Sequence, residues 1–153
     1  MSTKSHSLGG SYPYKMDAKC RVSIPSEWRA TISNGVLRLM VSHNEKLPLL
    51  KVLTEREFEK MQKEVDDSER SPAQKRSILG MLFERCTKSH INEQGKLSIP
   101  KGLLDHPGLV AGEGLVLCGR GDFIEILNEE NHAKLRAAQD AAIGEFNDEF
   151  GFF

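Results

Sequence analysis

The sequence predicts an α+β protein, mainly β, in which two similar halves share a small barrel or an interlocked sheet. A ten-residue pattern occurs twice, at residues 16–25 and 91–100: an apolar residue, a short polar turn, a cation and then Ser-Ile-Pro. A second similarity, between residues 51–55 and 125–129, keeps nearly the same offset, which favours a duplication over chance recurrence of a strand-turn-strand composition. Each half has roughly 75 residues, near the lower limit for an independent core, so the halves are expected to pack together.

Composition excludes several classes of protein. The chain has 153 residues, 28% of them charged and 39% hydrophobic, which is typical of a globular protein and not of a disordered one. It has no apolar run of the roughly 20 residues that a membrane span needs, and its first twelve residues lack the apolar region of a signal peptide. Three widely spaced cysteines (Cys20, Cys86 and Cys118) indicate reduced thiols in a cytoplasmic protein.

The first half is expected to begin after a disordered leader, residues 1–9, and to form a domain over residues 10–70. Alternating apolar residues predict a strand over 10–15, and Pro13 places it at a sheet edge because proline cannot donate a ladder hydrogen bond. A turn at 17–20, a return strand at 21–24 and a helical start at 25–29 follow. Strands are then predicted at 36–42 and 47–53 around a polar loop at 43–46, and Thr54 and Glu57 form a capping-box pattern that opens a helix.

The second half is expected to span residues 71–147. Ser71 is the predicted N-cap and Pro72 the first residue of a connecting helix with an apolar face. The second turn, residues 93–95, leads into a return strand at 96–99 and a short helix. Strands at 115–118 and 123–127 enclose a tight turn, and Asn128 caps a last helix that continues to about 147. Residues 148–153 are expected to form an acidic tail with three phenylalanines, which either dock on a surface or are a liability for expression.

The first turn contains a pair of opposite charges, Asp17 and Arg21, four positions apart. Their simplest role is structural, because an exposed ion pair across a turn contributes at most about 1 kcal/mol. The alternative is functional: Asp17 holds Arg21 so that its planar guanidinium meets a phosphate or a guanine edge, which it can bond with two parallel hydrogen bonds. The residues alone leave both readings open.

Residues 10–25, with the pattern Gly-x-Tyr-x-Tyr-x-Met-Asp-Ala-Lys-x-Arg-x-x-Ile-Pro, resemble the first signature of the MraZ family of bacterial transcription regulators. Gly95, Lys96, Ile99 and Pro100 resemble part of its second signature, and the likeness covers about residues 10–140. The resemblance implies two SpoVT/AbrB-type domains that form a duplicated AbrB-like swapped-hairpin β-barrel with connecting and C-terminal helices. It also implies double-stranded DNA as the partner, bound by a ring-like homo-oligomer that regulates the division and cell-wall gene cluster.

The DNA-binding residues implied by the resemblance are Asp17, Lys19, Arg21, Asn92 and Lys96. Three positions depart from the family pattern. Cys20 stands where the family usually has glycine, and a cysteine is strained there if the turn keeps a left-handed residue. Asn92 and Lys96 replace an aspartate and an arginine, so the second turn is expected to contact DNA more weakly or to contact phosphate alone.

Two functions remain after this reading. The first is a sequence-specific DNA-binding regulator, expected to be a repressor in the cytoplasm and nucleoid. The second is an AbrB-fold oligomeric protein-interaction module without DNA affinity, which the near-neutral net charge of −1 and the two altered signature positions favour. No enzyme is expected, because the five histidines lack metal-like spacing and the serines of the repeated motif lack a His/Asp pairing. We expect no cofactor, metal, membrane or small-molecule substrate.

Overall fold

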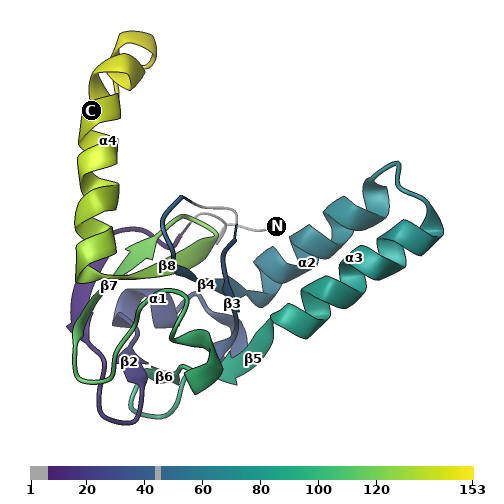
Figure 1. The fold of residues 1–153 in the computed structure, drawn as a ribbon, viewed down its shortest axis with the longest axis horizontal. Coiled ribbons are helices and arrows are strands. Elements are labelled where there is room, and N and C mark those ends of the chain that lie inside the picture. The colour runs from purple at the N-terminus through teal and green to yellow at the C-terminus, as the bar shows by residue number, and fades with distance from the viewer. Residues whose placement is uncertain (1–6, 44–45) are drawn as a thin grey trace.

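The computed structural model describes residues 7–43 and 46–153. Its centre is an antiparallel six-stranded sheet in the order β1-β7-β8-β4-β3-β5, beside which β2 and β6 form a two-stranded ribbon (Figure 1). The strands are β1 Ser11–Lys15, β2 Arg21–Ser23, β3 Val36–Val41, β4 Leu50–Thr54, β5 Thr87–His90, β6 Lys96–Ser98, β7 Gly114–Gly119 and β8 Phe123–Asn128. The helices are α1 Ser26–Arg29, α2 Glu55–Asp67, α3 Pro72–Arg85 and α4 Glu129–Glu149, with short 3-10 turns η1 Ser33–Gly35 and η2 Lys101–Leu103. The protein is therefore α+β and mainly β, as the sequence predicts.

Strands from the two predicted halves are interleaved in the sheets. β1 pairs with β7, β5 with β3, β4 with β8 and β2 with β6, so each of these pairings joins a strand before residue 71 to one after it. The order of the large sheet is unchanged when each strand is exchanged for its counterpart, β1 for β5, β3 for β7 and β4 for β8. The two halves therefore share one sheet and cannot each bury a core alone.

Local sequence explains how the sheet begins and ends. β1 lies at one edge, as Pro13 predicts, and Pro13 is opposite Val116 of β7. The chain before β1 also packs on the sheet: Leu8 is 2% exposed, and its N–H and C=O bond Gly121 at 3.0 and 2.7 Å. Residues 1–6 of the expected leader lie outside the described residues, as do residues 44–45 of the loop between β3 and β4.

The main core lies between the large sheet and the β2–β6 ribbon. Trp28 of α1 is 1% exposed, and its indole Nε1 donates to the Gly9 carbonyl at 2.9 Å. The same core contains side chains from both halves, among them Met16, Val22, Leu37, Leu39, Leu97, Ile99, Leu115, Leu117 and Ile124. Val22 and Ile24 of the first motif and Leu97 and Ile99 of the second are all buried in this one core, so burial of these apolar residues brings the two repeated motifs together.

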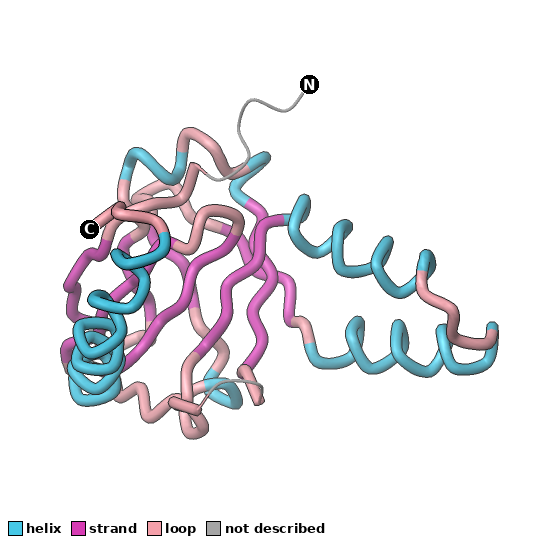
Figure 2. Tube along the Cα trace, turned by 90° about the horizontal axis from the view of Figure 1, so that it is seen from above, coloured by secondary structure: helices cyan, strands magenta, loops and turns pink. Residues whose placement is uncertain are grey.

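The helices α2 and α3 form a hairpin that projects from one side of the sheet (Figure 2). The predicted cap of α3 is present: Ser71 Oγ accepts from Gln74 N at 3.2 Å, and Gln74 Oε1 accepts from Ser71 N at 3.1 Å. Thr54 likewise caps α2 by accepting from Glu57 N at 3.1 Å. The Glu57 carboxylate, which the sequence predicts would reach back to the cap, instead lies 3.5 Å from Lys60 Nζ, because a cation one turn along is available to it.

The last helix, α4, packs on β7 and β8 by its first turns only. Asn128 caps it, since Asn128 Oδ1 accepts from Asn131 N at 2.7 Å. Beyond Leu135, which packs against Val116 and Leu127, the helix rises clear of the body, and the C-terminus lies at its far end (Figure 1). Within the described residues, no helix is long and apolar enough to cross a membrane.

Candidate nucleic-acid interface

The first repeated turn is built around the Asp17 side chain. Asp17 Oδ1 accepts from the backbone N–H groups of Lys19 and Arg21, at 2.9 and 2.8 Å. The turn is closed by the Asp17 N–H, which donates to Arg21 O at 3.0 Å. A carboxylate or amide side chain that accepts backbone N–H groups two residues on is the usual way that aspartate and asparagine stabilise such turns.

The second turn has the same conformation. Asn92 Oδ1 accepts from the N–H groups of Gln94 and Lys96, at 3.0 and 2.9 Å, and Asn92 N donates to Lys96 O at 2.8 Å. The amide oxygen of Asn92 therefore accepts the same two backbone hydrogen bonds that the Asp17 carboxylate accepts in the first turn. What the substitution removes is the negative charge.

Both turns need a left-handed residue before the cation. Cys20 has φ of 60° and Gly95 has φ of 77°. The cysteine therefore keeps the left-handed conformation expected of the glycine that the MraZ family usually has at this position. The Cys20 side chain is 5% exposed and belongs to the main core. Its burial, which the sequence does not predict, offsets part of the cost of a left-handed conformation at a residue with a Cβ.

The Arg21 guanidinium is held by Asp17. Arg21 Nε donates to Asp17 Oδ2 at 2.9 Å, and Lys96 Nζ of the second turn approaches the same oxygen at 3.8 Å. The backbone N–H of Arg21, helped by its guanidinium and by the N–H of Lys19, lowers the pKa of Asp17 from its ordinary value. Asp17 is therefore ionised at neutral pH, and the Arg21 and Lys96 side chains remain about one third exposed.

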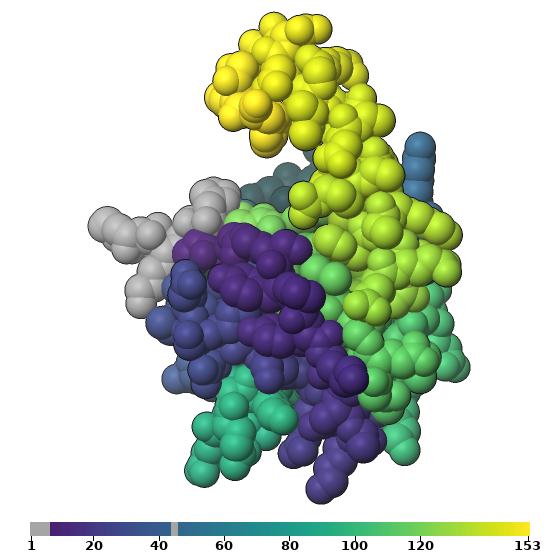
Figure 3. All heavy atoms as spheres, turned by 90° about the vertical axis from the view of Figure 1, so that its left-hand side faces the viewer, coloured from purple at the N-terminus to yellow at the C-terminus, as the bar shows by residue number. Residues whose placement is uncertain are grey.

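The two turns project at the same end of the molecule (Figures 1 and 3). The hydrogen bonds from Ile24 N to Gly95 O and from Ile99 N to Cys20 O, both 2.9 Å, fix each turn against the strand that follows the other. All five residues that the sequence comparison singled out, Asp17, Lys19, Arg21, Asn92 and Lys96, lie in these two turns. The structure thus brings together two stretches that are 75 positions apart.

One further cation, Arg29, belongs to this end of the molecule. A Cβ built on Gly95 would overlap the Arg29 guanidinium, so Arg29 lies against the second turn. The two turns, residues 17–21 and 92–96, are named here the paired turns. They carry three cations (Lys19, Arg21, Lys96) against two carboxylates (Asp17, Glu93), and Arg29 of α1 adds a fourth cation beside them. The repeat gives no signal for Arg29, because its counterpart 75 positions on is Leu104. The available signal is the excess of positive charge in residues 1–30, which hold five lysines and arginines against two acidic residues.

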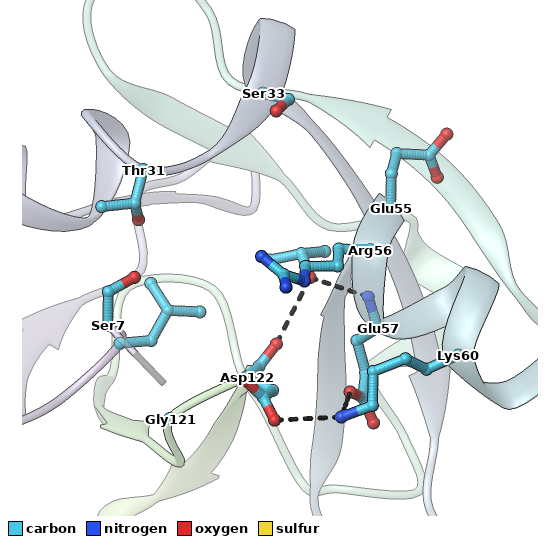
Figure 4. Close-up of a pocket in the computed structure, with 11 residues that line it drawn as sticks. Ser7, Thr31, Ser33, Glu55, Arg56, Glu57, Lys60, Gly121 and Asp122 are labelled. Atoms are coloured by element: carbon cyan, nitrogen blue, oxygen red, sulfur yellow. Dashed lines mark hydrogen bonds and ion pairs between the residues drawn. The ribbon is translucent and has the colours of Figure 1, made fainter. Parts of the chain in front are cut away.

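A pocket of about 160 Å³ lies away from the turns, at the N-terminus of α2 (Figure 4). Lys60 bridges its walls, 3.3 Å from Asp122 and 3.5 Å from Glu57. Thr54 Oγ1 donates to the Asp122 carbonyl at 3.3 Å. These contacts of Thr54 and Lys60 with Asp122 tie α2 to the β7–β8 turn, so they serve as a structural brace.

The cysteines and histidines within the described residues are not grouped into a metal site. Cys20, Cys86 and Cys118 are free and buried, and burial raises the pKa of the Cys86 and Cys118 thiols. Over residues 7–43 and 46–153, no three His, Cys, Asp or Glu side chains are grouped in a way that could hold a metal ion.

The chain is similar to bacterial transcription regulators over most of its length. No protein-family model matches it. The relative "Transcriptional regulator MraZ" of Micrococcus luteus is 24% identical over 92% of this chain and 94% of its own. The protein of the same name from Mycobacterium ulcerans is 28% identical over 89% and 96%, and that of Coxiella burnetii is 26% identical over 76% of both. The solution structure of PHS018 from Pyrococcus horikoshii aligns with 79% of this chain at 17% identity and a TM-score of 0.35, too low to inform the fold comparison.

The class of protein that this chain resembles is therefore that of the bacterial transcription regulators, by the names of these relatives. The resemblance to the MraZ family that the repeated motif predicts is confirmed, since the similarity extends across both halves of the chain.

Proposed function

We propose that this protein is a DNA-binding transcription regulator that contacts double-stranded DNA with its paired turns. The observation that carries the proposal is the pair of identically folded turns, which together with Arg29 of α1 present four cations against two carboxylates on a surface that projects from the body. Neutralisation of phosphates by lysine and arginine supplies most of the affinity of proteins for DNA. The names of the relatives point to the same activity.

Within the paired turns, each residue has a different role in the proposal. Arg21 reads a base edge or clamps a phosphate, because Asp17 fixes its guanidinium at 2.9 Å and leaves the rest of the fork exposed. Lys96 and Lys19 contact phosphates, since an ammonium group is a point charge that cannot bond bidentately. Asn92 holds the second turn and does not orient a cation by charge.

The finer features of the proposal come from the MraZ resemblance. They are a repressor of the division and cell-wall gene cluster, a ring-like homo-oligomer, and a location in the cytoplasm on the nucleoid. The proposal also takes the interleaved strands to be a duplicated AbrB-like swapped-hairpin barrel, with domains over residues 10–70 and 71–147. The strand pairings between the halves and the symmetric sheet order support this interpretation.

The second candidate function is an AbrB-fold interaction module without DNA affinity. The observation in its favour is the second turn, which has lost both the carboxylate and the arginine of the family pattern at Asn92 and Lys96. The two functions differ in their response to salt. Binding through phosphates weakens steeply as salt rises, whereas an apolar protein interface does not.

Gel-shift binding to the duplex upstream of the protein's own gene, at moderate salt, tests the proposal. Arg21→Ala should lose specific binding by roughly 5- to 150-fold per engaged copy, the value of one bidentate base contact. Lys96→Ala should weaken binding less and equally across sequences, as expected of a phosphate contact. Arg70→Ala is the matched control, because it removes one exposed arginine from the linker between α2 and α3. Unchanged affinity in Arg21→Ala, or an equal loss in Arg70→Ala, would remove the paired turns from the interface.

A further inference from the structure

The face of the sheet that lies away from the main core carries a second, smaller core. Side chains alternate along β8, so that Ile124 and Ile126 belong to the main core, while Glu125 and Leu127 lie on the opposite face. The buried residues of this second core are Leu49, Val116, Cys118 and Leu127. Helix α4 covers this face only with its first turns and then leaves the sheet (Figure 1). The second core is therefore incompletely covered.

The uncovered part forms a groove of about 390 Å³, named here the basal groove, between α4, β8 and the segment that precedes β4. Its apolar lining residues, within the described part of the chain, are all aliphatic: Leu47, Leu49, Leu127, Leu135 and Ala138. Two of its walls are tied together, because Asn131 Nδ2 of α4 donates to Pro48 O at 3.4 Å. Clefts of roughly 300–1,000 Å³ with a mainly apolar lining and a few polar groups are typical of small-molecule sites.

The charged residues of the basal groove are three cations and one carboxylate: Lys46, Arg120, Lys134 and Glu125. The Glu125 side chain is 6% exposed, and Arg120 Nε donates to its Oε1 at 2.7 Å. This bond holds the Arg120 guanidinium, which forms no other hydrogen bond or ion pair among the described residues. Lys134 lies 3.5 Å from Glu130, but both side chains are exposed, at 60% and 79%, so water screens that pair. The groove therefore combines an aliphatic lining with an excess of positive charge.

A histidine next to the groove responds to the same charge. His132 lies in the first turn of α4, and its pKa is lowered from the ordinary value by burial and then by the positive charges of Arg136 and Arg120. Nearby cations disfavour the charged form of a histidine. The direction of this pKa shift agrees with an excess of positive charge at the base of α4.

The apolar end of this chain cannot fill its own groove. From Ala138 to Glu149 the helix rises about 16 Å away from the sheet. The last residues then fold back on the helix, because Phe153 N donates to Asn147 Oδ1 at 2.7 Å. The groove is therefore open to a molecule from solution.

We propose that the basal groove binds a small aliphatic carboxylate, with its hydrocarbon chain against the leucines and its carboxylate at Arg120 and Lys134. The lining favours an aliphatic chain over an aromatic ligand, since it offers leucine and alanine side chains and no ring on which an aromatic group could stack. The remaining N–H groups of Arg120 can bond a carboxylate, and Lys134 adds a point charge. Glu125 is a positioning residue, because it acts on the ligand only through Arg120.

Calorimetric titration of the full-length protein with decanoate, kept below its micelle concentration, tests the proposal. Decanoate should bind saturably, with one molecule per chain. Each methylene that enters the groove should strengthen binding about fourfold, so octanoate should bind roughly 15-fold more weakly than decanoate. Decan-1-ol has the same chain without the charge and should bind at least roughly tenfold more weakly, because it forms no charged hydrogen bond.

A substitution that fills the groove tests the location. Ala138→Phe places a ring in the groove from an exposed position on α4 and should abolish decanoate binding. Ala137→Phe is the matched control, since Ala137 is also exposed but does not line the groove, and it should bind decanoate as the wild type does. Both variants should keep the melting temperature of the wild type, because neither position is buried.

Removal of two lysines tests the role of charge. Lys46→Gln with Lys134→Gln should weaken decanoate binding by roughly 2- to 30-fold, the range expected for two exposed ion pairs, and should leave the affinity for decan-1-ol unchanged. The control is Lys63→Gln with Lys88→Gln, which removes the same charge from exposed lysines outside the groove. The control should bind both ligands as the wild type does.

Several outcomes would overturn the proposal: no saturable binding of decanoate, equal affinities for octanoate and decanoate, or undiminished binding in Ala138→Phe. Sedimentation of the protein with phosphatidylglycerol vesicles, without saturable binding of free decanoate, would make the groove a membrane contact and would also overturn it. The titration contains no DNA, and the basal groove shares no residue with the paired turns. A failure of the proposed DNA binding and a failure of this proposal are therefore distinguishable.

Discussion

Replacement of Cys20 by glycine and by alanine tests whether the first turn is held in the left-handed conformation at a cost. Cys20 has φ of 60° and a side chain that is 5% exposed, so two effects oppose each other. Cys20→Ala removes the buried sulfur and keeps the backbone strain. By analogy with deletion of one buried methylene, it should cost about 0.5–1.5 kcal/mol.

Cys20→Gly also removes the Cβ, which costs about 0.8 kcal/mol of burial, and adds about 0.5–1 kcal/mol of unfolded-state entropy. Against these, it relieves the left-handed strain of about 1–2 kcal/mol. The loss of Cβ burial and the added unfolded-state entropy together nearly equal the strain that is relieved. Cys20→Gly should therefore be about as stable as Cys20→Ala, and both should be about 1 kcal/mol less stable than the wild type. For a chain of this length, that is a fall in melting temperature of roughly 2–4 °C.

Thermal and urea unfolding of the three proteins, side by side, give the answer. At a right-handed position glycine would be clearly worse than alanine, so a glycine variant that melts 4 °C or more below the alanine variant would refute the left-handed assignment. A glycine variant more stable than the wild type would show that the thiol contributes no packing energy.

The remaining predictions concern Asp17 and Trp28. Asp17→Asn should melt within about 2 °C of the wild type, because Asn92 makes the same backbone hydrogen bonds in the second turn, whereas Asp17→Ala should melt roughly 2–4 °C lower; equal losses would contradict this. Because folding lowers the pKa of Asp17, its contribution is complete above the ordinary value of 3.8 and is lost as the pH falls through the lower folded value. The melting difference between wild type and Asp17→Asn should therefore change only below about pH 4, and a change near neutral pH would refute it. Trp28→Phe should cost about 2 kcal/mol by leaving a cavity and an unpaired Gly9 carbonyl, measured by urea unfolding; a loss under 0.5 kcal/mol would count against the indole hydrogen bond.

Local chemistry made much of the fold predictable. The caps at Ser71 and Asn128 and the edge position of Pro13 depend on neighbouring residues alone, and all three are present. The left-handed residue at Cys20 was predictable because its counterpart in the repeat is Gly95. These features need no knowledge of which strands pair.

Long-range features were not predictable from one sequence. Nothing in β1 specifies that its partner is β7, because the backbone N–H and C=O groups at the edge of a strand can pair with many other strands. The contact of Arg29 with the second turn depends on how α1 packs across the ribbon, and the ion pair of Lys60 with Asp122 depends on the position of the β7–β8 turn. The two repeated turns lie side by side because β2 pairs with β6, and this pairing is not encoded in the residues of either turn.

The salt dependence of affinity for duplex DNA tests the central claim most directly. The measurement compares wild type with the double variant Lys19→Ala and Lys96→Ala, and plots the logarithm of affinity against that of salt concentration. The wild type should lose affinity steeply, and the double variant should have a slope shallower by about two units for each engaged copy. A wild-type affinity that is insensitive to salt, or two equal slopes, would contradict DNA binding through the paired turns.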